Sequence, residues 1–179
     1  MSLKSLGLVI QLNHTTFCEN PVPCHTSMVV IHTNGIHEVA FRYCDCSRAI
    51  SPHLQLLRRR IYPSSHLNIV TCATFELLDT LHKISLTTKS STYDLYSAVE
   101  KLTNNTGLNV PKSKYRHLHR MLLQWRHLKL LMWAGRGHDP TGPEGTNPGD
   151  LALRCPSCPY PEINLPEGWR NVPAGERQV

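Results

Sequence analysis

Cysteine and histidine side chains gather near the N-terminus in a pattern that suits metal ligation. Cys18, Cys44 and Cys46 offer three thiols, and His14 lies four residues before Cys18. Zinc takes four thiolate or imidazole ligands at tetrahedral corners, held by short loops next to a hairpin. The sequence therefore predicts a zinc site formed by His14, Cys18, Cys44 and Cys46.

Three further residues are alternatives for the fourth ligand, namely Cys24, His25 and His37. The competing interpretation is that the cysteines are ordinary small buried residues, since cysteine is among the most buried residue types. Three cysteines and a histidine around one predicted hairpin favour the metal interpretation.

A second thiol pair, Cys155-x-x-Cys158, is bordered by prolines near the C-terminus. It joins the first cluster, takes another ligand such as His138, or needs ligands from outside this chain. A redox role is disfavoured because the βαβ context of thioredoxin-like motifs is absent from the pattern. We therefore include Cys155 and Cys158 among the predicted zinc ligands, whereas Cys72 is expected to be ordinary core.

The cysteine count also bears on the compartment. The chain has seven cysteines, an odd number, and residues 1–13 lack the uninterrupted apolar stretch and the cleavage site of a signal peptide. Reduced thiols and an intracellular, nuclear location are expected. No apolar run approaches the roughly 20 residues that a membrane helix needs, so no membrane association is expected.

The elements that must position these ligands begin with β-structure. Residues 6–12 alternate with the period of a strand. Residues 28–32 and 36–43 are two further strand-like runs, and Asn34-Gly35 lies between them. Asn-Gly in this context is the strongest short signal for a hairpin with a type I′ turn. Cys44 and Cys46 directly follow the predicted hairpin.

Helices are predicted for the remainder, at about residues 51–60, 74–86, 91–104 and 111–134, from apolar spacing and from capping residues such as Ser91. The predicted fold is α+β, with a zinc-ribbon-like β-hairpin module followed by a bundle of about four helices and a Cys-x-x-Cys tail. The expected segments are 1–47, 48–135 and 136–179, packed as one unit.

Positive charge is concentrated in residues 111–138, which contain seven basic residues and no acid, against a net charge of +6 for the whole chain. Such a segment is typical of proteins that bind a polyanion. The aromatic rings of the segment are expected to pack inward. The alternative is a solvated helix face. The predicted DNA-binding residues are Lys112, Lys114, Arg116, Arg120, Arg126, Lys129 and Arg136.

Catalytic patterns are weak in this sequence. The aspartates are scattered, and no acidic pair has a spacing that suits two-metal chemistry. Metal ligation explains the clustered Cys and His residues more economically than a thiol nucleophile does. The sequence therefore predicts a protein that is not an enzyme and has no small-molecule substrate.

Several spaced motifs resemble the CxC cysteine-cluster domain associated with KDZ transposases of fungi. The resemblance covers nearly the whole chain. It is carried by the stretches around Leu6–Cys18 (with Gln11-Leu12 and His14), Asn34-Gly35-Ile36-His37-Glu38-Val39, Tyr43-Cys44-Asp45-Cys46, Gln55-Leu56-Leu57-Arg58, Thr74-Phe75, Ser91-Thr92-Tyr93-Asp94, Trp125-Arg126, residues 134–140 and Cys155-Pro156-Ser157-Cys158-Pro159.

The resemblance implies a metal-binding module of a longer transposase, with its catalytic core further toward the C-terminus and more cysteines upstream. Partners would then be DNA and the missing upstream and downstream parts of the transposase. Our first hypothesis is a zinc-stabilised module that assists DNA binding or transposase assembly. The second is a protein-interaction scaffold or an inactive remnant, and the third, a thiol or metal-dependent enzyme, is the least favoured.

Overall fold

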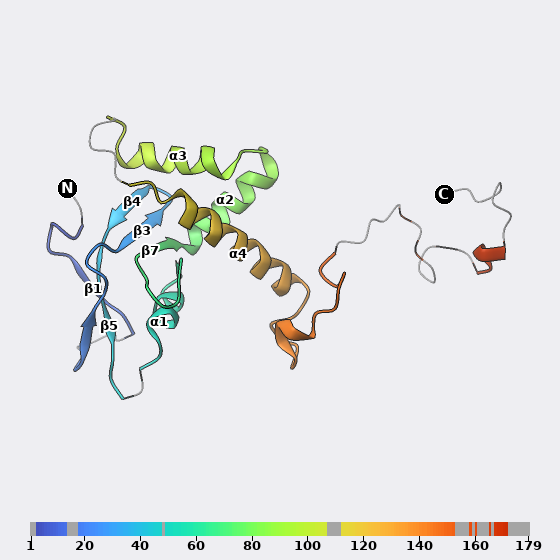
Figure 1. Ribbon diagram of the computed structural model, residues 1–179, viewed down its shortest axis with the longest axis horizontal. Helices are drawn as coiled ribbons and strands as arrows, with labels where there is room; N and C mark the ends of the chain where they lie inside the picture. Colours follow the sequence, from blue (N-terminus) through green and yellow to red (C-terminus); the bar gives the residue numbers. More distant parts are fainter. Residues whose placement is uncertain are drawn as a thin grey trace. The chain divides into compact units, whose positions relative to one another are not determined.

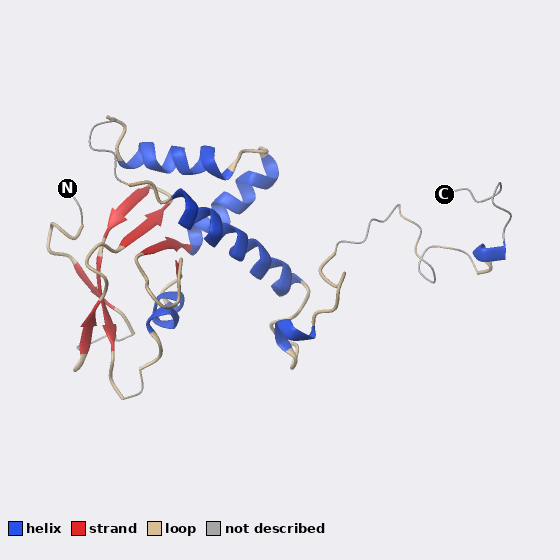
Figure 2. Ribbon diagram, viewed as in Figure 1, coloured by secondary structure: helices blue, strands red, loops and turns tan. Residues whose placement is uncertain are grey.

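The computed structural model describes residues 3–13, 18–47, 49–106, 112–152, 158, 160, 165 and 167–171. The chain divides into two units, Met1–Lys129 and Leu130–Val179. Both β-sheets belong to the first unit, together with helices α1 (Pro52–Arg58), α2 (Phe75–Thr87) and α3 (Thr92–Thr103) (Figures 1 and 2). The predicted α+β class is therefore confirmed.

A three-stranded sheet carries the first part of the chain. It has the order β1-β5-β2, formed by β1 (Val9–Gln11), β5 (Ala40–Cys44) and β2 (Pro21–Pro23). The central strand β5 pairs in parallel with β1 and antiparallel with β2. The strand predicted at residues 6–12 is confirmed only in its second half, because residues 3–7 form turns.

A four-stranded sheet forms the centre of the first unit. Its order is β4-β3-β7-β6, built from β4 (Gly35–Glu38), β3 (Val29–His32), β7 (Thr71–Thr74) and β6 (Ile61–Pro63). The β3–β7 pair is parallel and the other two pairs are antiparallel. A parallel pair needs a long crossover, which here includes β4, β5, α1 and β6.

The predicted hairpin is present as β3 and β4, but its turn differs from the prediction. His32 pairs with Gly35, so the two loop residues are Thr33 and Asn34. Neither has the positive φ of a type I′ turn. Gly35, with φ +146°, follows the loop, and a side chain on it would meet Thr103 Oγ1 at 3.0 Å. The close approach of Thr103, the last residue of helix α3 (Thr92–Thr103), together with this positive φ therefore favours glycine.

The sequence analysis predicted no strand between residues 60 and 74, where the structure has two, β6 and β7. Both are short, at three and four residues. An apolar run of this length does not distinguish a buried strand from a buried helix segment. Residues 71–74 form a strand because the free edge of β3 provides a parallel partner for β7.

The strand-like run 36–43 is divided between the two sheets. Its first part is β4, and its second part is β5 of the other sheet. Val39 lies at the passage, where its N–H donates to the carbonyl oxygen of Met28 (3.1 Å). Val39, Phe41 and Tyr43 are all buried, as their shared face predicts.

Four α-helices follow the predicted order, namely α1 (Pro52–Arg58), α2 (Phe75–Thr87), α3 (Thr92–Thr103) and α4 (Tyr115–Trp133). Thr74 caps α2 by accepting a hydrogen bond from the Leu77 N–H (3.3 Å). Ser91 and Asp94 form a reciprocal capping box at the start of α3. Such caps satisfy N–H groups that have no partner within the helix, which explains why these two starts were predictable.

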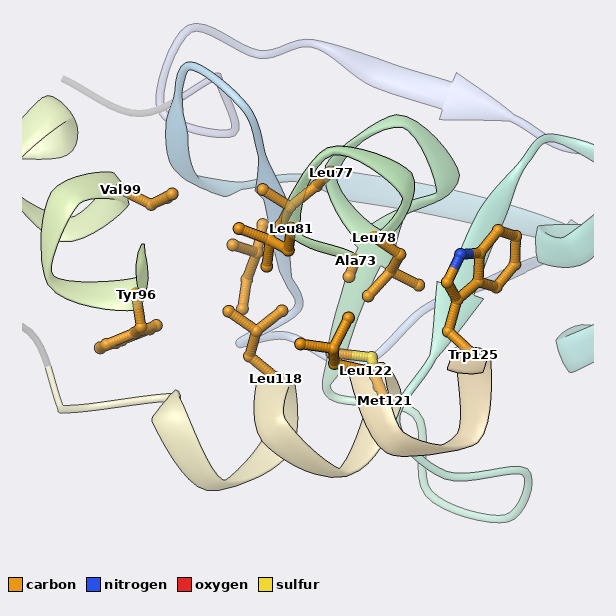
Figure 3. Packing of buried hydrophobic residues seen from close by; sticks show 11 residues of the cluster. Ala73, Leu77, Leu78, Leu81, Tyr96, Val99, Leu118, Met121, Leu122 and Trp125 are labelled. Carbon is orange, nitrogen blue, oxygen red and sulfur yellow. The ribbon is translucent and has the colours of Figure 1, made fainter. Parts of the chain in front are cut away.

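The main core lies between the four-stranded sheet and helices α2, α3 and α4 (Figure 3). Ile31 and Ala73 come from the sheet, and Leu78, Leu118 and Trp125 are among the helical contributors. The prediction of a helix bundle is therefore corrected: the apolar faces of these helices are buried partly against strands.

A second core lies on the other face of β3 and β7. The side chains along a strand alternate between faces, so Val30 and Cys72 belong to the second core whereas Ile31 and Ala73 belong to the first. The second core also contains Leu56 of α1.

The second unit contains two short 3-10 helices, η1 (Gly142–Gly145) and η2 (Trp169–Asn171). The loop that follows α4 is held by Arg136, which forms salt bridges with Asp139 (2.7 Å) and Asp150 (2.8 Å). Among the described helices of the chain, none combines the length and apolar character needed to cross a membrane.

The main core gives a direct test of the fold. Leu118 is fully buried in α4, whereas Leu123 on the same helix is 49% exposed. We expect Leu118→Ala to lower the unfolding free energy by about 2–5 kcal/mol, because it removes buried methyl groups and leaves a cavity. Leu123→Ala should change it by less than about 0.5 kcal/mol. Urea denaturation of the two variants checks this, and equal effects would contradict the packing of α4.

Candidate metal centre

Three of the predicted metal ligands meet at the end of the three-stranded sheet. The sulfur atoms of Cys18, Cys44 and Cys46 all lie within 4.8 Å of one another. Cys18 Sγ and Cys46 Sγ are 3.7 Å apart. Cys18 and Cys44 are buried and Cys46 is half-buried, so the group is closed to solvent on most sides.

Strand pairing explains how Cys18 reaches residues 28 positions further along. Cys18 lies three residues before β2, and Pro21 is paired with Cys44 in the β2–β5 register. Beyond that pair, the backbone N–H of Asp45 donates to the backbone carbonyl of Asn20 (3.0 Å). The side-chain amide of Asn20 in turn donates to the backbone carbonyl of Asp45 (3.1 Å). These two bonds hold the segment after Cys18 against the segment between Cys44 and Cys46.

Two prolines are compatible with β2 because of where they lie in the ladder. Cys24 donates to the Phe41 carbonyl and Asp45 to that of Asn20. Bonded and non-bonded pairs alternate in an antiparallel ladder. Pro21 and Pro23 therefore occupy non-bonded positions, where the nitrogen faces away from β5 and no N–H is needed.

The backbone of Cys44 is held by a side chain instead of a strand. In β5, the carbonyl of Arg42 faces β1 and accepts the Leu12 N–H (2.9 Å). The groups of Cys44, two residues on, face the same side, but β1 has already ended and Asn13 turns away with φ +67°. The backbone N–H and carbonyl of Cys44 thus have no strand beside them on this side of β5.

Gln55 of α1 supplies the missing partner. Its Oε1 accepts the Cys44 N–H (2.9 Å), and its Nε2 donates to the Cys44 carbonyl (2.8 Å) and to the Ile50 carbonyl (2.7 Å). A glutamine amide offers the same donor and acceptor as a peptide group. Gln55 is buried, so it continues the ladder at the point where it fixes a cysteine of the cluster.

The sequence analysis missed the role of Gln55. The signal was present, since Gln55 belongs to one of the stretches that carry the family resemblance, and glutamine is rarely buried without partners. Which backbone it would contact was not visible in the sequence, because the contact depends on where β1 ends.

The spacing of the sulfur atoms fits a tetrahedral thiolate site. With Zn–S bonds of about 2.3 Å, two sulfur ligands at tetrahedral corners lie about 3.8 Å apart. The Cys18–Cys46 separation of 3.7 Å agrees with this. The Cys46 N–H also donates to Cys44 Sγ (3.4 Å), and such bonds stabilise a sulfur that carries negative charge.

Burial controls the protonation of Cys18 in the absence of metal. Desolvation raises the pKa of Cys18 to about 11, although a backbone hydrogen bond from Asn20 acts in the opposite direction. At neutral pH this thiol is protonated, and a thiol is a poor nucleophile compared with a thiolate. A bound cation would favour the thiolate, so the arrangement suits metal ligation better than thiol catalysis.

The described part of the chain does not settle the other predicted ligands. His14 and Cys155 lie outside the described residues, and Cys158 is exposed in the second unit. The alternatives for the fourth position are engaged elsewhere. Cys24 Sγ accepts the Phe41 N–H (3.1 Å), His25 bonds Ser27, and His37 Nε2 lies 2.8 Å from Asn34 Oδ1.

The predicted DNA-binding cations are distributed less simply than the sequence indicates. Lys129 forms a salt bridge with Asp79 (3.1 Å) and lies over the Trp125 ring, and Arg136 is paired with two aspartates. Burial raises the pKa of Asp79, but hydrogen bonds from Lys129 and Trp125 outweigh it and lower that pKa. Two of the seven positive charges are thus neutralised within the chain.

A third cation is partly withdrawn from the surface. Arg126 is half-buried and donates to Ser85 Oγ (2.7 Å). With Arg126 set aside because of this bond, the cations without an acidic partner among the described residues are Lys112, Lys114, Arg116 and Arg120. Trp125 is buried, as predicted for the aromatic residues of this segment, but Trp133 is 70% exposed, so the prediction is wrong for that ring.

The fold and the site together define an α+β domain with a buried cysteine cluster at a sheet end. The family model described as CxC2 like cysteine cluster associated with KDZ transposases matches residues 3–107. The chain belongs to this family, as the resemblance of its motifs indicates. The match includes the three clustered cysteines and Gln55 and ends before α4. Comparison with curated proteins and with solved structures gives no match.

The contact between Gln55 and Cys44 yields a prediction that does not require metal. Gln55→Leu leaves the two buried backbone groups of Cys44 without partners, at about 1–3 kcal/mol each. We expect the unfolding free energy to fall by roughly 2–4 kcal/mol and Cys44 to react faster with a thiol reagent. Urea denaturation and thiol-labelling rates measure the two effects.

Gln124→Leu is the matched control, because Gln124 is exposed on α4 and its loss should change neither quantity. A Gln55→Leu protein as stable as the control, with Cys44 equally protected, would show that the ladder does not depend on this amide.

Proposed function

We propose that this chain is a non-catalytic zinc-binding module of a KDZ-type transposase-like protein, which assists DNA binding or transposase assembly. The observation that carries the proposal is the meeting of three cysteine sulfur atoms at the end of β5 in a chain of this family. Cys18, Cys44 and Cys46 would hold the ion, and one further ligand would complete a tetrahedron.

The donor set favours zinc over other common cations. Magnesium and calcium prefer oxygen ligands, and the described group offers three sulfurs. Thiolates select zinc, copper(I) or iron, and the tetrahedral spacing suits zinc. Zinc bound here would supply a cross-link between the segment before β2 and the end of β5.

A structural role is favoured over a catalytic one. Catalytic zinc sites keep an open position for water or substrate, whereas Cys18 and Cys44 are almost fully buried. The sheet that the ion would tie is small, since β1 and β2 have three residues each. Short strands gain most from a cross-link that orders them, which supports a stabilising metal.

The metal proposal is tested by elemental analysis of the purified full chain. We expect one zinc ion for each chain, and we expect Cys44→Ser to lose it. A ligand bound at about 1,000 times its Kd contributes about 4 kcal/mol to stability, so chelation should lower the thermal midpoint of the wild type and leave that of Cys44→Ser unchanged.

Cys24→Ser is the control, because Cys24 is a half-buried thiol that borders the same sheet and lies outside the cluster. It should retain the metal. Retention of zinc by Cys44→Ser, or the absence of zinc from wild-type protein, would contradict the proposed site.

Assistance to DNA binding is supported by the cations of α4 and the segment before it that have no acidic partner. Each phosphate contact lowers the logarithm of affinity by about 0.9 for each tenfold rise in salt. Four available cations predict a slope no steeper than about −4, whereas seven would give about −6. Titration of a labelled DNA duplex at several salt concentrations measures it, and a flat response would favour the scaffold or remnant alternative.

A further inference from the structure

A pocket of about 370 Å³ lies within the first unit, away from the cysteine cluster. Its walls come from α1, from the connection between β6 and β7, and from α4. The polar groups that line it are those of His53, Ser64, Ser65, His66, Arg120 and Gln124. None of the described lining residues is acidic, although hydrogen-bond donors converge there from three parts of the chain.

Arg120 provides the fixed positive charge of this pocket. Its guanidinium donates a hydrogen bond to the carbonyl oxygen of Ser64. Ser64 is buried, and its own N–H donates to the Thr71 carbonyl (2.9 Å) at the start of β7. The sheet therefore anchors the loop, and the loop orients the arginine. A guanidinium has five N–H donors, so most remain for a ligand.

Two histidines line the other walls of the pocket. The rings of His53 and His66 pack edge to face, with centroids 6.4 Å apart. An imidazole, a serine hydroxyl and a glutamine amide can all donate hydrogen bonds. The rest of the wall is formed by Leu57, Tyr62 and Pro63. Convergent donors on an apolar wall are the usual composition of a small-ligand site.

The surroundings of the pocket are positively charged as well. Arg116 is exposed one helical turn before Arg120 and has no acidic partner among the described residues. Desolvation, followed by the charges of Lys114 and Arg120, lowers the pKa of His117, as expected where positive charge is not neutralised. An anion entering the pocket would therefore meet a favourable field along α4.

We propose that this pocket binds a phosphate ester, with Arg120 and His66 as its principal ligands, and that the nucleic-acid backbone supplies the phosphate. Arginine matches the oxygens of phosphate in a bidentate geometry. Arg116 would contact the next phosphate along the strand. The choice of nucleic acid rests on the proposed accessory role, whereas the phosphate chemistry rests on the pocket alone.

The test titrates the full chain with inorganic phosphate, with a nucleoside monophosphate and with a short single-stranded oligonucleotide. Calorimetry follows the small anions, and fluorescence anisotropy follows the oligonucleotide. We expect Arg120→Gln and His66→Gln to weaken inorganic phosphate binding about fivefold or more, since each removes a direct ligand. The exposed position of His66 makes His66→Gln the variant whose folding is least at risk.

Arg116→Gln is the matched control, with the same charge change on the same helix but outside the pocket lining. It should leave inorganic phosphate binding unchanged. It should lower the affinity for the oligonucleotide by about twofold to threefold, as loss of one contact with the nucleic-acid backbone would. Thermal unfolding of each variant verifies its fold.

Equal losses for Arg116→Gln and Arg120→Gln would overturn the pocket in favour of diffuse charge attraction, as would no phosphate binding at about 10 mM, a concentration at which even weak sites fill. If the protein binds the nucleoside monophosphate but not the oligonucleotide, the nucleic-acid backbone is not the source of the phosphate. Metal content is measured on the same samples. Wild-type protein that is purified without zinc but binds phosphate would overturn the zinc proposal alone. Zinc-loaded protein that fails to bind phosphate would overturn the pocket alone.

Discussion

The buried amide of Gln55 is the contact on which the geometry of the cysteine cluster depends. A strand that runs past its neighbour exposes backbone groups that must be paired if they are buried. Cys44 is in that situation because β1 ends at Gln11. Gln55 pairs both of its backbone groups. The side chain of α1 thereby does what another strand residue would do, and it fixes the position from which the Cys44 sulfur meets Cys18 and Cys46.

The parts of the fold that the sequence predicted are those decided by neighbouring residues. The β3–β4 hairpin, the cap at Ser91 and the apolar stripe of α4 each depend on interactions within a few positions. The parallel pairing of β7 with β3 was missed because it joins segments about 40 residues apart. In the site, the short Cys44-x-Cys46 spacing was informative. The role of Gln55 was hidden, since it follows from the length of a strand elsewhere.

The basic segment likewise could be predicted from the sequence only in part, because ion pairs with distant residues change how many of its charges are available. The absence of acidic residues from 111–138 is a property of the sequence, and it suggests one continuous basic face. Tertiary packing brings Asp79 of α2 to Lys129, and Ser85 to Arg126. The positive charges without an acidic partner are thereby concentrated toward the beginning of α4. A charge count therefore sets an upper limit on phosphate contacts, and the packing decides how many of them are available.

Helix α1 connects the two candidate sites. Its seven residues carry Gln55, which holds Cys44, and also His53 and Leu57, which line the pocket beside Arg120. Residues two positions apart on a helix do not face one another, so one short helix can serve both sites. Because both sets of contacts lie on one helix of seven residues, fewer than two turns separate the cysteine end from the pocket wall. A stabilising ion at the cluster would thus also fix the histidine side of a phosphate site, which gives a metal module a physical means of influencing nucleic-acid contacts without touching the nucleic acid.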